Sequence, residues 1–394
     1  MSSANLVRLT AIEETVYGET PVAGNFKTAR FTSEALSGTP DTSESQSIRT
    51  DRLSSGQVVV GLTVGGDVNS ELAKEDITDD FIESAMYSSW DAKAPVAVDL
   101  TIDTTAKTIV RAAGDWTVDV EVGDVLTLTA FADSNNNTEV MVTEVQNATT
   151  IRFSGPDTMV DEVGVGTSYQ IADEIEIGIT QKSFSMEKAF LDLTDKAINY
   201  RGMIVSTMNH SVTYGEIVNS TFGFQGNDYQ PVEAAANFIT DGRTIDSPAT
   251  SNSLNGSVDM PFLINNASGT LDTSDFCIQS VDLNLNNNAT AQTCVGQAAP
   301  DSYNAGTAQI EVSLTAYLAN ENWAMLAKKL TQDPISLGFI VKNSDGFYGF
   351  FLPAVQLSFE DPASTGINQD VFLNMTGVAK VGASNEKSLK MFRS

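Results

Sequence analysis

The chain has 394 residues, of which 51 are Asp or Glu and 22 are Lys or Arg, giving a formal net charge of −29. Its length predicts more than one domain, and its 41% share of hydrophobic residues allows a sizeable core. The acidic balance argues against tight nucleic-acid binding, which needs clustered Lys and Arg. No apolar run is long enough to span a membrane as a helix, and the first ten residues lack the apolar centre of a secretory signal.

Strand patterns dominate the chain in sequence order. Segments rich in β-branched and aromatic residues, many alternating with a period of two, predict strands at 58–68, 175–190, 202–214, 278–285, 310–317 and 371–378. Two amphipathic patterns predict half-buried helices at 79–90 and 322–330. We therefore expect a mainly β fold.

The segment 37–56 is about twenty polar residues between apolar segments. One interpretation is a mobile surface loop. The other is an arm that orders against a neighbouring subunit through charge-assisted pairs made by Arg49, Asp51 and Arg52.

The chain contains a candidate internal repeat. Residues 202–212 align without a gap on 349–359, and each half has the order strand, strand, amphipathic helix, strand, strand. We expect a first unit formed by 1–97 and 173–230 and a second unit formed by 231–394. The stretch 98–172, between the two parts of the first unit, carries short strand signals, 12 acidic residues and three basic ones. It predicts a small inserted all-β domain, either a barrel or an Ig-like sandwich.

The search for catalytic or metal-binding motifs gives weak candidates. His210, the single histidine, lies inside a strand pattern, and we expect a structural role for it. Asp133 to Glu144 imitates the ligand spacing of an EF-hand loop, but Thr138 stands where that loop needs Gly, so a polar turn is favoured over a calcium site.

The remaining candidates also have structural interpretations. Cys277 and Cys294 flank a predicted hairpin, and buried free thiols are favoured over a disulfide. Asp76, Asp79 and Asp80 indicate a charged helix start rather than a carboxylate pair. We expect no enzyme activity, no cofactor and no metal.

Several short segments, in this order along the chain, resemble the major tail tube proteins of long, non-contractile-tailed bacteriophages. They are 7–9, 14–21, 30–36, 48–52, 64–68, 182–188, 222–226 and 368–371. The resemblance implies β-sandwich or half-barrel units, each with a flanking helix, whose sheets join between subunits into an inner barrel. It also implies that the insert resembles the extra β domain that some tube proteins carry on the exterior.

The resemblance implies a structural virion protein that assembles in the host bacterial cytoplasm into stacked rings of the tail. Two units per chain would make the ring a trimer with pseudo-sixfold symmetry. Implied partners are copies of the chain itself, the tape measure, tail tip and tail terminator proteins, and genomic DNA passing without specific binding. An acidic lumen would repel phosphate, although the sequence does not tell which residues face it.

Two other function classes remain open at the level of sequence. An acidic surface or receptor-binding β module would not polymerise, whereas a tube protein would. A glycosidase would need paired carboxylates in a cleft with aromatic sugar platforms. The three Trp residues, Trp90, Trp116 and Trp323, are scattered along the chain, which disfavours the glycosidase.

Overall fold

The computed structural model describes residues 3–48, 50–51, 53, 56–233, 243–257, 262–265, 271–273, 277–320, 323, 325–359, 361–364, 366–382 and 387–394. Within these ranges the protein is mainly β, which confirms the expected class. The helical elements of the described residues are η1 (Ala4–Leu6), α1 (Asp76–Met86), α2 (Trp116–Asp119), η2 (Ser134–Asn136) and α3 (Met325–Thr331).

Most strands belong to one large network of paired strands. Its members are β1 (Val7–Glu13), β2 (Asn25–Ala29), β3 (Ser33–Glu34), β4 (Ser37–Glu44), β5 (Gln57–Glu71), β14 (Asp173–Glu176), β15 (Phe184–Phe190), β16 (Lys196–Thr213), β17 (Asn219–Gly226), β18 (Asp228–Glu233), β19 (Thr244–Ile245), β20 (Phe262–Asn265), β21 (Leu271–Thr273), β22 (Ile278–Asn286), β25 (Gln309–Tyr317), β26 (Ile335–Asn343), β27 (Gly346–Phe359), β28 (Phe372–Ala379) and β29 (Lys390–Arg393). A separate short hairpin joins β23 (Thr290–Gln292) to β24 (Ser302–Asn304).

The two halves of this network repeat one pairing pattern. In the first half, β5 precedes helix α1 and pairs with β17, and β16 pairs with both β15 and β17. In the second half, β25 precedes α3 and pairs with β28, and β27 pairs with both β26 and β28. Each half also has an outer strand, β4 beside β5 and β22 beside β25. The halves are joined where β22 pairs with the end of β16.

The joined strands have one buried and one wet face, because successive side chains of a strand point to opposite sides. A row such as Val68, Phe222, Met208, Leu285 and Ile310 is buried in the main core. Helix α1 closes this core on one flank, and Phe81 packs edge-on against Phe184, Phe222 and Phe224.

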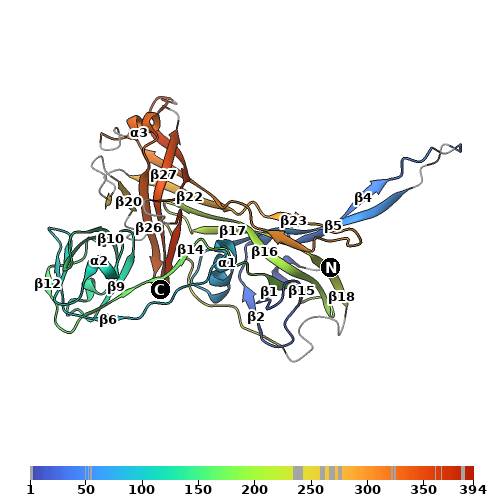
Figure 1. Ribbon diagram of the computed structural model, residues 1–394, viewed down its shortest axis with the longest axis horizontal. Helices are drawn as coiled ribbons and strands as arrows, with labels where there is room; N and C mark the ends of the chain where they lie inside the picture. Colours follow the sequence, from blue (N-terminus) through green and yellow to red (C-terminus); the bar gives the residue numbers. More distant parts are fainter. Residues whose placement is uncertain are drawn as a thin grey trace.

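Residues 96–171 form a second sheet with a core of its own. Its strands are β6 (Val96–Ala97), β7 (Leu100–Asp103), β8 (Thr108–Arg111), β9 (Val125–Thr129), β10 (Glu139–Val145), β11 (Thr150–Ser154), β12 (Glu162–Val163) and β13 (Ser168–Ile171). Trp116 and Tyr169 are buried in contact with each other at its centre. This sheet lies at one end of the elongated molecule, opposite the tip of the β4–β5 hairpin (Figure 1).

The second sheet also packs firmly on the second half. Val125 and Met141 share a buried cluster with Phe347, Phe351 and Phe392. At Gly123 a Cβ would meet the Phe351 ring at 2.3 Å, so the close approach requires glycine there.

Two expectations about local structure need correction. The first helix spans Asp76–Met86 rather than 79–90, because Tyr87 takes the left-handed conformation and ends it. The segment 37–56 is not simply a loop, because its first part, β4, is a strand paired with β5. The sequence did not predict β4, because its Gly, Pro and Asp residues have low strand propensity. These residues form a strand here because β5 lies beside them as a pairing partner.

Candidate functional site

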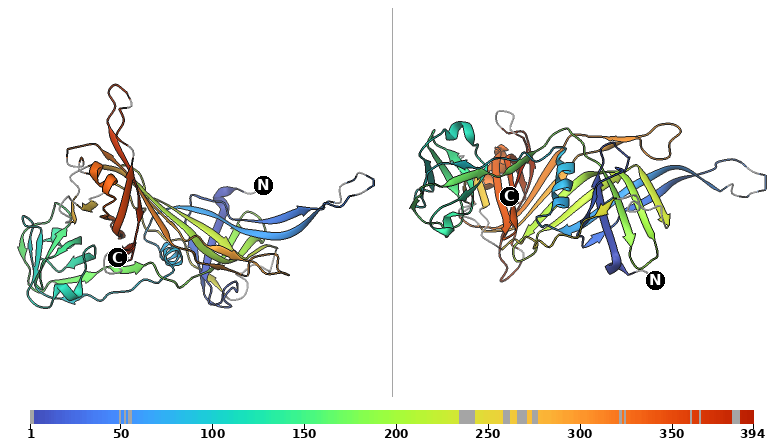
Figure 2. Two further views of the ribbon diagram at one scale, coloured as in Figure 1. Left: turned by 45° about the horizontal axis from the view of Figure 1, so that its top comes forward. Right: turned by 90° about the horizontal axis from the view of Figure 1, so that it is seen from below.

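The β4–β5 hairpin projects from the body as a long two-stranded ribbon (Figures 1 and 2). Val58, Val59 and Val60 are 62%, 60% and 61% exposed, so both faces of this part of the ribbon present apolar side chains. Ile48 and Leu53 near the tip are also exposed. An isolated two-stranded ribbon is at best marginally stable in water, and its exposed valines make it a candidate contact surface.

Of the predicted arm residues, Asp51 lies near the tip of this hairpin. Asp51 accepts a hydrogen bond from the backbone N–H of Leu53 at 3.2 Å. Arg49 and Arg52 lie outside the described residues, so the expected charge-assisted pairs stay a prediction.

A second candidate surface is the wet face of the sheet that runs from β5 to β28. The registers place three rows of outward side chains across it. The rows are Asp67, Thr207, Asn286 and Gln309; then Asn69, Thr221, Asn209, Asn284 and Glu311; then Glu71, Asn219, Ser211, Asp282, Ser313 and Thr376. These side chains are exposed or half-buried in the free chain.

This wet face carries carboxylates, amides and hydroxyls, with one exposed apolar side chain, Val378 of β28, opposite Glu311. Strands β5, β17, β22, β25, β27 and β28 contain no Lys or Arg anywhere in their sequences, and neither does 207–213 of β16. Lys and Arg are the side chains that neutralise phosphates in nucleic-acid complexes. The surface is therefore built without the groups that would hold a nucleic-acid backbone.

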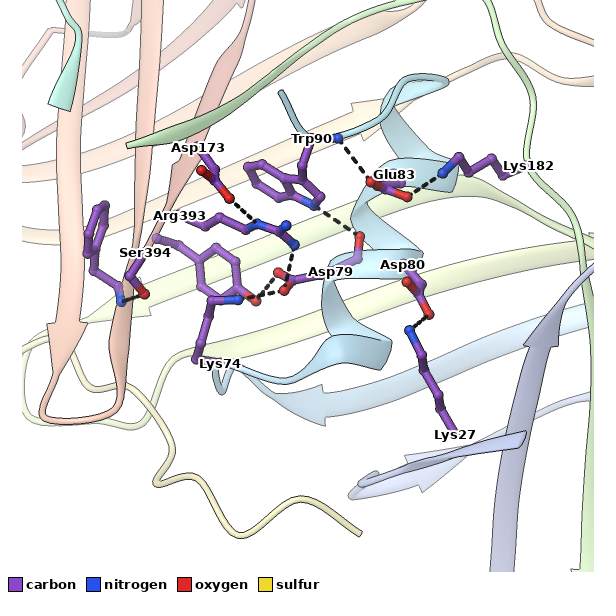
Figure 3. A network of polar contacts seen from close by, with 12 residues as sticks. Lys27, Lys74, Asp79, Asp80, Glu83, Trp90, Asp173, Lys182, Arg393 and Ser394 are labelled. Carbon is purple, nitrogen blue, oxygen red and sulfur yellow. Dashed lines mark hydrogen bonds and ion pairs between the residues drawn. The ribbon is translucent and has the colours of Figure 1, made fainter. Parts of the chain in front are cut away.

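The third feature is a buried polar network around Asp79 of α1, shown in Figure 3. The Asp79 carboxylate accepts hydrogen bonds from Lys74 Nζ at 2.6 Å and from the Tyr348 hydroxyl at 2.7 Å, and it pairs with the Arg393 guanidinium at 2.8 Å. Burial, together with the negative charge of Asp79, raises the pKa of Tyr348 well above its usual value, so the phenol stays a donor.

Arg393 extends this network to two further segments. Its guanidinium lies over the Trp90 ring, 4.6 Å from the centroid, and its Nε is 3.5 Å from an Asp173 carboxylate oxygen. Strand β29, which carries Arg393, also pairs with both β14 and β27. The network thus ties helix α1 of the first half to the second half and to the C-terminal strand.

The three predicted helix-start carboxylates do not form one site. Asp79 belongs to this network, Asp80 pairs with Lys27, and Asp76 begins the helix on an exposed position. The sequence expectation missed Arg393. Strand β29 is a four-residue segment, Lys-Met-Phe-Arg, with no alternation that would have marked it.

The weak catalytic and metal candidates have structural roles. His210 is buried in β16, its Nδ1 lies 2.8 Å from the Ser220 hydroxyl, and burial lowers its pKa to about 4. Asp133 accepts from the Asn135 N–H and caps the short η2 turn, as a polar turn requires. Among the described residues no three His, Cys, Asp or Glu side chains gather as a metal site would need.

The cysteine expectation is half wrong. Cys277 and Cys294 are free, as expected, but both are exposed rather than buried. The strand pattern predicted that they flank a hairpin, whereas Cys277 lies just before β22 and Cys294 lies between β23 and β24.

The helices of the described residues include none that is both long and apolar enough to cross a membrane. A comparison with curated proteins gives no match to this chain. A comparison with protein families matches the model described as phage tail tube protein over residues 4–379. That match spans both halves and the second sheet inserted in the first half, and it agrees with the mainly β architecture. The chain belongs to the phage tail tube protein family, a family of structural virion components of the tail.

Proposed function

We propose that this protein polymerises as stacked rings into the phage tail tube and that the wet face of its β5-to-β28 sheet lines the channel. The observation that carries the proposal is the continuity of a face free of Lys and Arg across both halves of the chain. Duplex DNA that passes such a wall meets carboxylates and neutral polar groups, so its phosphates find no cation to pair with.

The repeated pairing pattern supports a ring of three chains. Each chain would supply two tube units, formed by 1–97 with 173–230 and by 231–394, and 98–172 would be an Ig-like domain on the exterior. Placing the second sheet outside fits its position at the end of the molecule, away from the joined strands of the wet face (Figure 2).

The β4–β5 hairpin is proposed as the stacking arm. Its exposed valines would be covered by a subunit of the adjacent ring, with Arg49, Asp51 and Arg52 pairing at the tip. Copies of the chain, the tape measure, the tip and terminator proteins and DNA in transit are the partners this role implies. Assembly would take place in the host cytoplasm, and the product would be the virion tail.

Electron microscopy of the purified protein over a concentration series tests this function. We expect rings or tubes with a central channel and threefold symmetry in end views. Single particles at every concentration, also in the presence of a tail-tip complex, would contradict polymerisation. End views of six chains would keep the tube but contradict two units per chain.

A further inference from the structure

A cavity of about 440 Å³ lies where the second sheet meets strand β29. Among the described residues, its walls carry five carboxylates, three lysines and three aliphatic side chains. The walls are therefore acidic in balance, and the space is large enough for a molecule of several heavy atoms rather than a single water. Val118, one of the aliphatic residues, is 79% exposed, so the cavity is open to solvent on this side.

Two of the lysines in the walls are already held by carboxylates. Lys390 Nζ lies 2.8 Å from a Glu121 oxygen and 3.2 Å from a Glu176 oxygen. Lys93 Nζ lies 2.7 Å from a Glu174 oxygen. The side chains of these three glutamates are between 21% and 66% exposed. Both lysines are thus engaged by carboxylates that water also reaches.

The most buried carboxylate of the walls belongs to Asp124, which is only 5% exposed. Its Oδ2 accepts a hydrogen bond from the Glu121 N–H at 2.8 Å, and its backbone carbonyl accepts from the Val142 N–H at 2.8 Å. Its Oδ1 has no hydrogen-bond partner among the described residues. A buried carboxylate oxygen without a donor is costly, and these bonds hold the residue in place. The cavity therefore lacks a donor beside Asp124.

The chemistry of the walls selects the kind of ligand that would supply this donor. An ionised carboxylate only accepts hydrogen bonds, and a charged donor binds it more strongly than a neutral one. Among the described residues, no three carboxylates gather as direct metal coordination would need. Val118, Val120 and Ile171 offer an aliphatic surface that suits methylene groups. An alkylammonium ion combines a cationic N–H donor with such a chain.

We propose that this cavity binds a small alkylammonium cation, which donates an N–H to Asp124 Oδ1 and lays its alkyl chain along Val118, Val120 and Ile171. The cavity is walled both by the second sheet and by Lys390 of β29. The ligand would therefore tie the second sheet to the C-terminal strand, and it would stabilise the folded chain because the unfolded chain has no such site. This inference goes beyond the tube function, because the site lies within a single chain.

Isothermal titration calorimetry of the unassembled full-length chain tests the site. The titrations are made at about pH 8, where Asp124 is ionised and an alkylamine is protonated. Butylamine and 1,4-diaminobutane are the probes. 1-Butanol has a similar chain without charge, and tetramethylammonium has the charge without an N–H, so these two are the ligand controls. All titrations share one ionic strength, which keeps the general attraction of cations to this acidic chain constant.

We expect saturable binding of both amines at one site and none of either ligand control. Asp124→Asn keeps the shape of the side chain but removes its charge, and it should weaken both amines at least about tenfold. Asp157→Asn, which changes a fully exposed carboxylate of the same inserted segment, is the matched control and should bind as the wild type does. Circular dichroism checks that both variants are folded.

Three results would each overturn the site. They are the absence of saturable binding to the folded wild type, equal amine affinity in wild type and Asp124→Asn, and tetramethylammonium binding as tightly as butylamine. Displacement of the bound amine by an equal concentration of Mg²⁺ would also overturn it, in favour of a metal site. Because every titration uses the unassembled chain, none of these results bears on the tube function, which electron microscopy tests separately.

Discussion

At the residue scale, Asp79 shows how one buried carboxylate can hold distant segments. Its three partners come from the chain before α1, from β27 and from β29. Because Asp79 is only 4% exposed, its removal would leave the half-buried Lys74 cation and the buried Tyr348 phenol without this acceptor.

Asp79→Asn should therefore lower the free energy of unfolding by about 3 kcal/mol. Asp80→Asn is the matched control, since Asp80 has a single partner, Lys27, in a more exposed position, and should lose about 1 kcal/mol or less. Urea unfolding followed by Trp fluorescence measures both. Equal losses would show that the network adds nothing beyond an ordinary ion pair.

A second residue, Asp124, predicts a pH dependence. Burial raises its pKa to about 6, and its Oδ2 accepts a hydrogen bond from the Glu121 N–H. Among the described residues, its Oδ1 has no hydrogen-bond partner. It lines a cavity of about 440 Å³ between the second sheet and β29. A carboxyl whose folded pKa is raised binds its proton more tightly when folded, so its contribution to stability falls as pH rises from about 4 to about 6.

Asp124→Asn should consequently leave stability nearly unchanged at pH 4 and raise it by about 1–3 kcal/mol at pH 7. Thermal unfolding at a series of pH values measures the stability of the variant minus that of the wild type. Other titrating groups, such as His210, are the same in both proteins and cancel in this difference. Asp157→Asn, an exposed control, should show no such trend. A constant difference at all pH values would contradict the ionised, buried state of Asp124.

The lumen assignment also makes a residue-scale prediction. Glu311→Lys places a cation on the wet face, so tubes of this variant should retain a short fluorescent duplex at low salt and release it as salt rises. Asp157→Lys makes the same charge change on the second sheet. Retention by the Asp157→Lys tubes alone would place the channel elsewhere.

At the element scale, the β4–β5 hairpin separates folding from assembly. The described residues of its tip do not belong to the main core, and its exposed valines are available for a neighbour. Deleting 43–54 should leave a folded monomer with an unchanged circular dichroism spectrum but abolish tubes in electron micrographs. Normal tubes from that variant would remove the arm from the stacking mechanism.

At the scale of the whole molecule, the second sheet has a core of its own but also packs against the second half, so it cannot be removed without exposing that half. Removing 98–172 uncovers Ile340, Phe347, Phe351 and Phe392. It also removes Glu139, the ion-pair partner of Lys342, and Glu121, an ion-pair partner of Lys390.

We accordingly expect the simple deletion, bridged by a short Gly/Ser linker, to aggregate. The same deletion with Phe351→Thr and Ile340→Thr should form thinner tubes. Light scattering and electron microscopy distinguish these outcomes. A soluble core that forms no tubes would mean that the second sheet is part of the ring.

Much of the fold follows from local pattern. Alternation in Ile310, Val312 and Leu314 predicts a strand with one buried face, and the structure has it. The apolar stripe of Phe81, Ile82 and Ala85 predicts a helix on a core. Strand β4 and the Asp79 network escaped prediction, because their residues are polar and gain their partners only from segments far away in the chain.

By itself, the amino-acid sequence determined the mainly β class, the acidic and cation-poor strands, the repeat of elements and the family resemblance. These properties reside in composition and in short-range periodicity, which need no knowledge of distant contacts. Only the tertiary structure decided that the wet rows of both halves share one face, that β22 adds to β16, and that Arg393 reaches Asp79. Strand pairing and buried ion pairs join residues far apart in sequence, and their register depends on a core that must form as a whole.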